Sequence, residues 1–254
     1  MNNQISFITA FKKFKGIYAP IQHSALYSWQ ANDIPVVASE NEVGLKEPCQ
    51  GYSNITLIQG VRRARELGLL HQAPIIRDLI GRALTHVKTP MVALVTPDVI
   101  IPGNFSNVLD QIFQKYGFNV FLYASRQDIQ LNYPVNSSDT YMAVQKEPRR
   151  PSNSYGMFIT SKFWWRRILS VMPEFILGRF VWDEWLRMYA EQNIKDRYNA
   201  SKILTLMHCI HDYNHVIIQE KAQPRKDPST AHNMKLWGQT RGNYKSDNWK
   251  ELEI

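Results

Sequence analysis

The sequence has no long hydrophobic run. Its longest apolar stretches, such as Met91 to Val95 and Val99 to Ile101, are interrupted by Thr, Pro and Asp. A membrane-spanning helix needs roughly 18 consecutive apolar residues, so no transmembrane segment is expected. The N-terminal Met-Asn-Asn-Gln carries no basic charge, and the apolar stretch after it is too short for a secretory signal. We therefore expect a cytoplasmic protein.

Cysteine is scarce, and acidic residues are outnumbered by basic ones. Cys49 and Cys209 form neither a metal-binding spacing nor a disulfide framework, which is typical of a reducing compartment. Against 22 Asp and Glu stand 30 Lys and Arg, giving a net charge of +8. This excess favours anionic partners such as nucleotide diphosphates, nucleic acid or phosphorylated polymers.

Apolar residues make up 44% of the 254 positions, enough to bury a full core. Strand-like and helix-like patterns alternate along the chain. Strands are expected at 5–10, 34–38, 55–58, 91–95, 118–123, 155–160 and 203–207, and helices at 19–31, 75–87, 104–116, 163–171 and 182–192. This alternation predicts an α/β fold with a mostly parallel, doubly wound sheet flanked by helices.

Two segments lack these patterns. Residues 125–154 are polar and rich in Asn, Ser, Asp and Pro, which indicates a long loop of the kind that covers substrates. After residue 219 the apolar content falls, so 1–219 is expected to be the folded domain and 220–254 a basic tail. That tail is either mobile or docked through Trp237 and Trp249.

Asp98 follows the continuous apolar strand at 91–95, which has the pattern of a buried parallel strand. Pro97 stops a central strand from continuing through this point. Ligands of doubly wound sheets bind beyond the carboxyl ends of the strands. A carboxylate there can hold Mg²⁺ or Mn²⁺ and bridge it to a diphosphate, although a simple turn-forming Asp has the same pattern.

Three segments carry a family resemblance: 92–101, 178–186 (Gly-Arg-Phe-Val-Trp-Asp-Glu-Trp-Leu) and 208–215 (His-Cys-Ile-His-Asp-Tyr-Asn-His). They resemble, in order, the L-x-Y-x-N-x-D-I-I-L, G-x-x-x-W-D-x-W-L and H-x-x-x-H-D-Y-S-H patterns of a family of GT-A-like glycosyltransferases. The resemblance implies a GT-A-like fold that uses a nucleoside-diphosphate sugar as donor. Thr96 stands where a D-x-D pattern has its first Asp, so the need for a metal stays open.

The second of these segments implies an acid/base region, and the density of histidines in the third suggests ligands, although histidines satisfied within the core are the alternative. Asp183, at the start of a predicted helix, is the first choice for the catalytic base, and Glu184 is the second. In an inverting transfer such a base removes the acceptor proton, while a metal or cationic groups neutralise the leaving diphosphate. A carboxylate that merely complements the helix dipole remains the alternative for Asp183. In the cluster His208, His211, Asp212 and His215, the residues expected to contact the diphosphate or the metal with Asp98 are His211 or His215.

Donor contacts are expected where strands end and on one helix. The predicted nucleotide-sugar ligands are Thr9, Ala10, Phe11, Ser39, Glu40, Arg77, Asp78, Thr96 and Asp98. The basic charge predicts an anionic acceptor, either a polymer such as hydroxymethylated phage DNA or a phosphate-bearing glycan intermediate. The alternative is a non-catalytic nucleotide- or nucleic-acid-binding protein on a GT-A-like scaffold.

Overall fold

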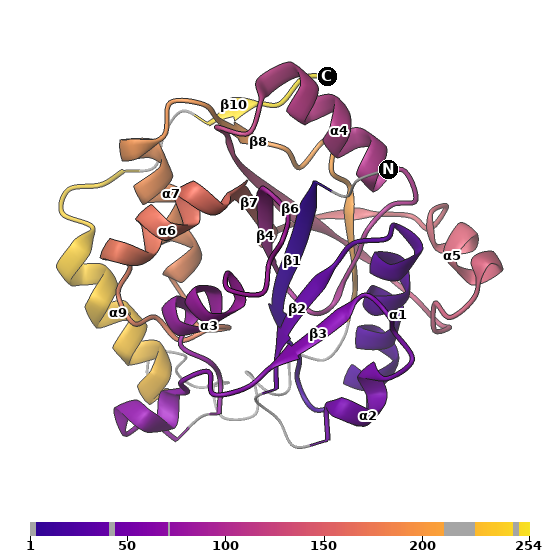
Figure 1. Ribbon diagram of the computed structural model, residues 1–254, viewed down its shortest axis with the longest axis horizontal. Helices are drawn as coiled ribbons and strands as arrows, with labels where there is room; N and C mark the ends of the chain where they lie inside the picture. Colours follow the sequence, from indigo (N-terminus) through magenta and orange to yellow (C-terminus); the bar gives the residue numbers. More distant parts are fainter. Residues whose placement is uncertain (1–3, 41–43, 71, 211–226, 246–248) are drawn as a thin grey trace.

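The computed structural model describes residues 4–40, 44–70, 72–210, 227–245 and 249–254. It has a curled, mostly parallel sheet with helices on both faces (Figure 1). The predicted α/β fold class is therefore confirmed. No helix in the described ranges is long and apolar enough to cross a membrane.

The first half of the sheet is parallel. It contains β1 (Ile5–Ala10), β2 (Val36–Ser39), β3 (Ile55–Ile58) and β4 (Met91–Val95). β1 lies between β2 and β4, and β3 pairs with β2 at the edge. Because these strands are parallel, their carboxyl ends meet on one side of the sheet, where ligands of such folds bind.

The second half of the sheet contains antiparallel pairs, formed by β7 (Arg150–Ser161) with its two neighbours and by β5 (Val99–Ile100) with β9 (Leu206–Cys209). β7 is antiparallel to both β4 and β6 (Phe121–Ile129). The first part of β6 pairs with β8 (Arg197–Asn199), which pairs in turn with β10 (Lys250–Glu251). The second part pairs with β9, which also pairs with β5.

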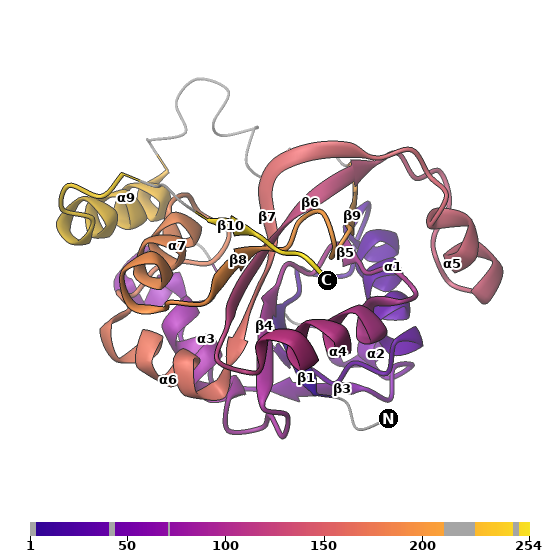
Figure 2. The ribbon, with the colours of Figure 1, turned by 90° about the horizontal axis from the view of Figure 1, so that it is seen from above.

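The loop predicted at 125–154 is wrong. β6 continues to Ile129, α5 spans Ser138–Val144, and β7 begins at Arg150. The two strands form a long ribbon that carries α5 to the outer side of α1 (Figure 2), where Tyr141 of α5 is buried and its ring centroid lies 5.9 Å from that of Tyr27. The sequence pattern missed this ribbon because its outer part is polar. That part is formed by backbone pairing with two register shifts rather than by strands with an apolar face. The strand predicted at 203–207 is β9, displaced to 206–209, and β8 has no counterpart in the prediction.

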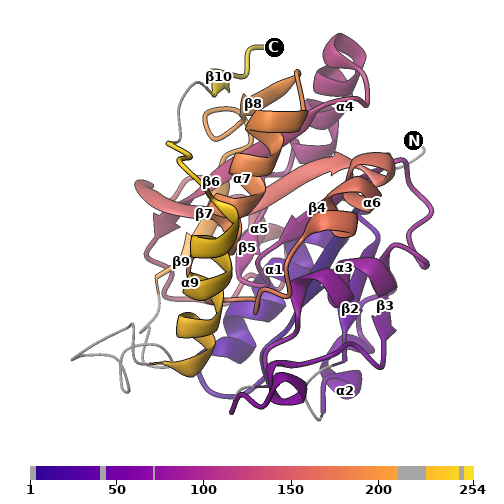
Figure 3. The ribbon, with the colours of Figure 1, turned by 90° about the vertical axis from the view of Figure 1, so that its left-hand side faces the viewer.

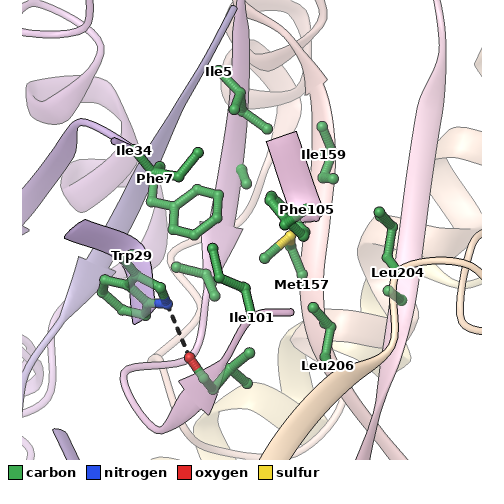
Figure 4. Close-up of a cluster of buried hydrophobic side chains, with 14 of the residues drawn as sticks. Ile5, Phe7, Trp29, Ile34, Ile101, Phe105, Met157, Ile159, Leu204 and Leu206 are labelled. Atoms are coloured by element: carbon green, nitrogen blue, oxygen red, sulfur yellow. Dashed lines mark hydrogen bonds between the residues drawn. The ribbon is translucent and has the colours of Figure 1, made fainter. Parts of the chain in front are cut away.

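One face of the sheet is covered by α1 (Tyr18–Ala31) and α4 (Phe105–Tyr116), with the short α2 (Lys46–Cys49) beside α1. Trp29 of α1 is fully buried and packs edge-on against Phe7, with 5.5 Å between the ring centroids (Figure 4). Phe105 of α4 contacts the other side of Phe7, with a centroid distance of 5.8 Å. These rings fix the helices against β1.

The opposite face carries α3 (Ile76–Ala83), α6 (Lys162–Val171) and α7 (Trp182–Asn193), preceded by the 3₁₀ turn η1 (Ala64–Leu67). α9 (Pro228–Thr240) lies along α7 (Figure 3). Trp249 packs on Tyr123, with 4.8 Å between ring centroids, just before β10 joins the sheet. Of the two alternatives for 220–254, docking therefore applies to the part that is described, while the domain boundary at 219 stays a prediction.

Candidate functional site

Asp98 lies in the turn between β4 and β5, at the carboxyl edge of the sheet as predicted. The turn is anchored from both sides of the fold. Thr96 N–H donates to the Gly156 carbonyl at 3.0 Å, and Trp29 Nε1 donates to the Val99 carbonyl at 2.9 Å. These hydrogen bonds to the backbone before and after Asp98 fix the turn that carries its carboxylate.

Gly156 of β7 lies where β5, β6 and β9 come close to β7. A Cβ atom at Gly156 would lie 3.1 Å from Leu206 Cδ1, 3.2 Å from Val99 Cγ2 and 3.4 Å from Arg126 Cβ. Those distances are shorter than ordinary carbon contacts. A larger residue at Gly156 would therefore need the side chains of Leu206 and Val99 to move by a few tenths of an ångström.

His208 and Asp128 complete the surroundings of Asp98. The imidazole of His208 is fully buried, with Nε2 3.4 Å from Asp98 Oδ2 and Nδ1 2.8 Å from Asp128 Oδ1. Sequence analysis favoured His211 or His215 here, and these two lie outside the described residues, as does Asp212. It missed Asp128, because that residue falls in the segment predicted to be a loop. The β6–β9 pairing, which aligns Asp128 with His208, is what brings the two together.

Lys12 lies close to Asp98 and also to two basic side chains, those of Arg179 and Arg126. Burial lowers the pKa of Lys12 to about 8; Asp98 opposes the shift, and Arg179 and Arg126 add to it. Lys12 Nζ lies 4.4 Å from the centre of the Tyr18 ring, and Arg126 is buried. These cations can neutralise a strongly anionic ligand beside Asp98.

A second carboxylate, Asp183, lies in the first turn of α7. Burial raises its pKa to about 6, although the Glu184 N–H donates to Oδ1 at 3.0 Å and opposes the shift. A carboxylate with a pKa near neutrality is suited to accept and release a proton. Val181, immediately before the helix, has a φ of 73°, which is unfavourable for a β-branched residue.

Glu184 is engaged differently. Its Oε1 accepts from the Tyr155 hydroxyl at 3.2 Å, and its Oε2 lies 3.4 Å from Arg187 Nη1. The Arg187 guanidinium also contacts the Tyr155 hydroxyl and lies over the Tyr123 ring, 5.0 Å from its centre. This network ties Glu184 into the packing of α7 against the sheet, so Asp183 is the better candidate for proton transfer.

The stretch from Glu174 to Phe180, called segment 174–180 below, leads to Val181 and Asp183 and is held by α9. Asn233 is fully buried; its Oδ1 accepts from the Ile176 N–H at 2.8 Å, and its Nδ2 donates to the Ile176 and Phe180 carbonyls at 3.0 and 3.2 Å. Arg179 Nε lies 3.1 Å from Asp227 Oδ2, at the start of α9. The backbone of this segment is therefore fixed at both ends.

The predicted nucleotide ligands lie at the carboxyl ends of β1 and β2, as expected. Thr9 Oγ1 donates to the Val95 carbonyl at 2.8 Å, and the side chains of Ala10 and Phe11 belong to the core. Ser39 is buried, and Glu40 Oε2 accepts from Gln59 at 3.0 Å. The side chains of Thr9 and Phe11 thus serve packing, and donor binding at these positions stays a prediction.

Arg77 and Asp78 face a cavity of about 740 Å³ between β3 and α3. Asp78 Oδ2 accepts from the Arg62 N–H at 2.6 Å and from Arg82 Nε at 3.0 Å. Within the described ranges, no three His, Cys, Asp or Glu side chains gather in a way that would hold a metal.

The sheet order, with β7 antiparallel beside β4 and Asp98 at the carboxyl edge, is a GT-A-like fold. Among solved structures, the chain is similar to Staphylococcus aureus TarS residues 1–349 in complex with UDP-GlcNAc. The TM-score is 0.57 and the identity 12%, over 96% of this chain and 68% of that one. The UDP complex gives a TM-score of 0.52 and 13% identity, over 94% of this chain and 73% of the other. No family model and no curated protein matches the sequence.

Proposed function

We propose that this protein is a glycosyltransferase that moves a sugar from a nucleoside diphosphate to an acceptor hydroxyl. The observation that carries the proposal is the pairing of Asp98 with His208 beside Lys12, Arg126 and Arg179, at the ligand-binding edge of a GT-A-like sheet. The TarS structures with UDP and UDP-GlcNAc support a uridine nucleotide sugar as the first donor to test.

A divalent cation such as Mn²⁺ or Mg²⁺ fits the residues present. Asp98 Oδ2 and His208 Nε2 face each other at 3.4 Å, close enough to share one ion, and Asp128 orients the imidazole through Nδ1. Thr96 Oγ1 is buried without a hydrogen-bond partner in the described structure, so it is available to a ligand oxygen. A bound cation would supply further positive charge for the diphosphate.

The proposed reaction is an inverting displacement with Asp183 as the base. The Asp183 carboxylate takes the proton from the acceptor hydroxyl, and the acceptor oxygen forms a bond to the anomeric carbon. The bond from that carbon to the diphosphate breaks, and its electron pair leaves with the diphosphate. Lys12 and Arg126 stabilise the charge that develops on the leaving group, while Arg179 is paired with Asp227.

The acceptor is proposed to be anionic, either a polymer such as hydroxymethylated DNA or a phosphate-bearing glycan intermediate. The net charge of +8 supports the sign of the acceptor charge. A gel-shift series in rising salt separates the two, because phosphate contacts with DNA weaken steeply as salt increases. Lack of salt-sensitive DNA binding would eliminate the nucleic-acid acceptor.

The donor proposal is tested by titrating UDP and UDP-GlcNAc, with and without Mn²⁺, while the melting temperature is recorded. We expect a rise in melting temperature with wild type, because a ligand that binds only the folded state stabilises it. In the presence of Mn²⁺, Asp98→Asn should weaken binding at least about tenfold because it removes a ligand of the proposed cation. Lys12→Gln should weaken binding by a similar factor because it removes a positive charge that attracts the diphosphate.

Arg166→Gln is the matched control, because Arg166 is exposed on α6 and lines neither the cavity nor the Asp98 site. It removes the same charge as Lys12→Gln and should leave binding unchanged. No shift with a panel of nucleotide sugars would contradict the proposal. Binding without Asp183-dependent transfer or donor hydrolysis would favour a non-catalytic nucleotide-binding protein instead.

A further inference from the structure

We propose that the cavity between β3 and α3, called the β3–α3 groove, binds a phosphate group of the acceptor at a distance from the hydroxyl that is glycosylated. This inference rests on the proposed function. The groove has a volume of about 740 Å³ and is lined by, among others, Gln59, Arg62, Arg77, Asp78, Arg82 and Glu174. It is separate from the residues around Asp98 and has no role in the reaction described above.

The charges of the groove leave one cation uncommitted. Arg62 is paired with Glu174 and lies 3.9 Å from Glu66. Arg82 is paired with Asp78 at 3.0 Å, so each of these two cations has an acidic partner. Arg77 is exposed and makes no hydrogen bond or ion pair within the described structure. A guanidinium in this position binds a phosphate through two parallel hydrogen bonds.

Gly81, in the middle of α3, lines the groove and adds no side chain to it. Glycine is an unfavourable residue in a helix, yet packing does not demand it here. A Cβ atom at Gly81 would meet only Leu169 Cδ1, at an ordinary 3.9 Å. The missing side chain therefore leaves room in the groove rather than relieving a clash.

Segment 174–180 connects the groove to the proposed reaction site. Glu174 lines the groove, and Arg179 lies in the neighbourhood of Lys12. Arg179 is the fifth residue after Glu174, so the Cα atoms of the two are at most about 18 Å apart even if the chain were fully extended. That span corresponds to a few units of a sugar-phosphate chain, so one acceptor molecule can occupy both places.

The lining favours a sugar-phosphate acceptor over a nucleic acid. The residues around the groove include no Phe, Tyr or Trp. Proteins that hold single-stranded nucleic acid stack its bases on such rings. A phosphate bound by Arg77, without base stacking, is the interaction that the groove offers.

The test uses inorganic tripolyphosphate as the probe and calorimetry on the full chain. Arg77→Gln removes the uncommitted cation, and Gly81→Gln fills the groove. Lys46→Gln is the charge-matched control, because Lys46 is exposed on α2, beside α1. All three are also made in a Lys12→Gln background, in which binding at the proposed diphosphate site is weakened.

We expect both groove variants to weaken tripolyphosphate binding about tenfold, as the loss of a bidentate contact or of access would. Lys46→Gln should change it less than about twofold, since a distant surface charge acts only through the screened field. Equal losses in Arg77→Gln and Lys46→Gln would overturn the proposal and indicate general attraction by net charge. The groove variants are also tested with oligonucleotides that contain adenine or thymine. If these variants lost more affinity for the oligonucleotides than for tripolyphosphate, the choice of a sugar-phosphate acceptor would be overturned.

UDP binding separates this inference from the proposed function. Arg77→Gln should leave UDP affinity unchanged; if it weakened UDP binding instead, Arg77 would be a donor ligand, as the sequence predicts, and the groove proposal would fail. If wild type bound no nucleotide at all, the donor proposal would fail, and the tripolyphosphate result would still stand or fall on the groove variants alone.

Discussion

Asp183 and Glu184 are neighbours in sequence, yet they meet different surroundings. The Asp183 carboxylate is desolvated and has a pKa raised to about 6, while Glu184 is engaged by the Tyr155 hydroxyl and by Arg187. Burial without a cationic partner disfavours the charged form of a carboxylate, which makes it a stronger base once ionised. The geometry therefore distinguishes two acidic residues that the sequence pattern could only rank.

Replacement of Asp183 should abolish transfer without abolishing donor binding. We expect Asp183→Asn to lower kcat by about 10²–10⁴, the usual contribution of general-base catalysis, while Kd for UDP stays within about twofold. Glu184→Gln should keep most of the activity, because its contacts are to residues of the packing network. Single-turnover assays with saturating donor measure both, and equal losses in the two variants would contradict the assignment.

The raised pKa of Asp183 has opposite effects on activity and stability. As pH rises through about 6, Asp183 becomes ionised, so kcat should increase over this range. The folded state binds this proton more tightly than the unfolded state, whose pKa is near 3.8, so its contribution to stability is complete below pH 4 and is lost as pH rises to 6. At pH 7 the free energy of unfolding of Asp183→Asn should therefore exceed that of wild type by up to about 3 kcal/mol, so the variant should unfold at a higher urea concentration. Urea titrations of both proteins at pH 4 and pH 7 test this, and a pH-independent difference would contradict it.

The backbone of Val181 is strained, two residues before Asp183. Its φ of 73° costs a β-branched residue about 1–2 kcal/mol, whereas Asn adopts this conformation readily. Val181→Asn should therefore stabilise the fold by about 1 kcal/mol. Val181→Thr keeps the branched shape and should give no gain. Chemical denaturation measures both, and equal stabilities of the two variants would show that the strain is absent in solution.

At the scale of single residues, the sequence predicts positions better than contacts. Asp98 was located from an apolar strand followed by proline, and Asp183 from the start of an aromatic-rich helix; the structure places both residues there. Asp128 was not found, because nothing in its local sequence indicates that it lies beside a histidine 80 positions later. Such a contact depends on strand pairing, which local patterns do not encode.

At the scale of elements, α9 acts as the support of segment 174–180. We expect Asn233→Ala to destabilise the protein by about 2–4 kcal/mol, because it removes three hydrogen bonds and leaves the buried N–H and carbonyl of Ile176 without partners. Asn107→Ala, at an exposed position of α4, is the matched control and should cost little. Equal midpoints in thermal unfolding would contradict this role of α9.

The elements themselves differed in how well sequence patterns found them. β4, β1 and α4 are continuous apolar or amphipathic segments, and their bounds agree closely with expectation. The β6–β7 ribbon was read as a loop, since its outer half has no apolar face and is held by backbone pairing between distant segments. Polar strands of this kind have no strong local signal.

At the scale of the whole molecule, residues 227–254 are expected to unfold together with the sheet. Trp249 packs on Tyr123, and β10 extends the sheet beside β8, so the described part of this region shares the core of the fold. Hydrogen exchange at increasing urea concentration should give the same midpoint for peptides of α9 and of β4. A markedly lower midpoint for α9 would restore the division at 219 into a domain and an independent tail.

The attachment of segment 174–180 also constrains the order in which the molecule folds. Ile176 and Asn233 are 57 positions apart in sequence, so the loop between them must close before the segment is held in place. Contacts of such long range form slowly compared with local helices and hairpins. The surroundings of Asp183 are therefore expected to be completed only when α9 docks, late in folding rather than with the formation of the sheet.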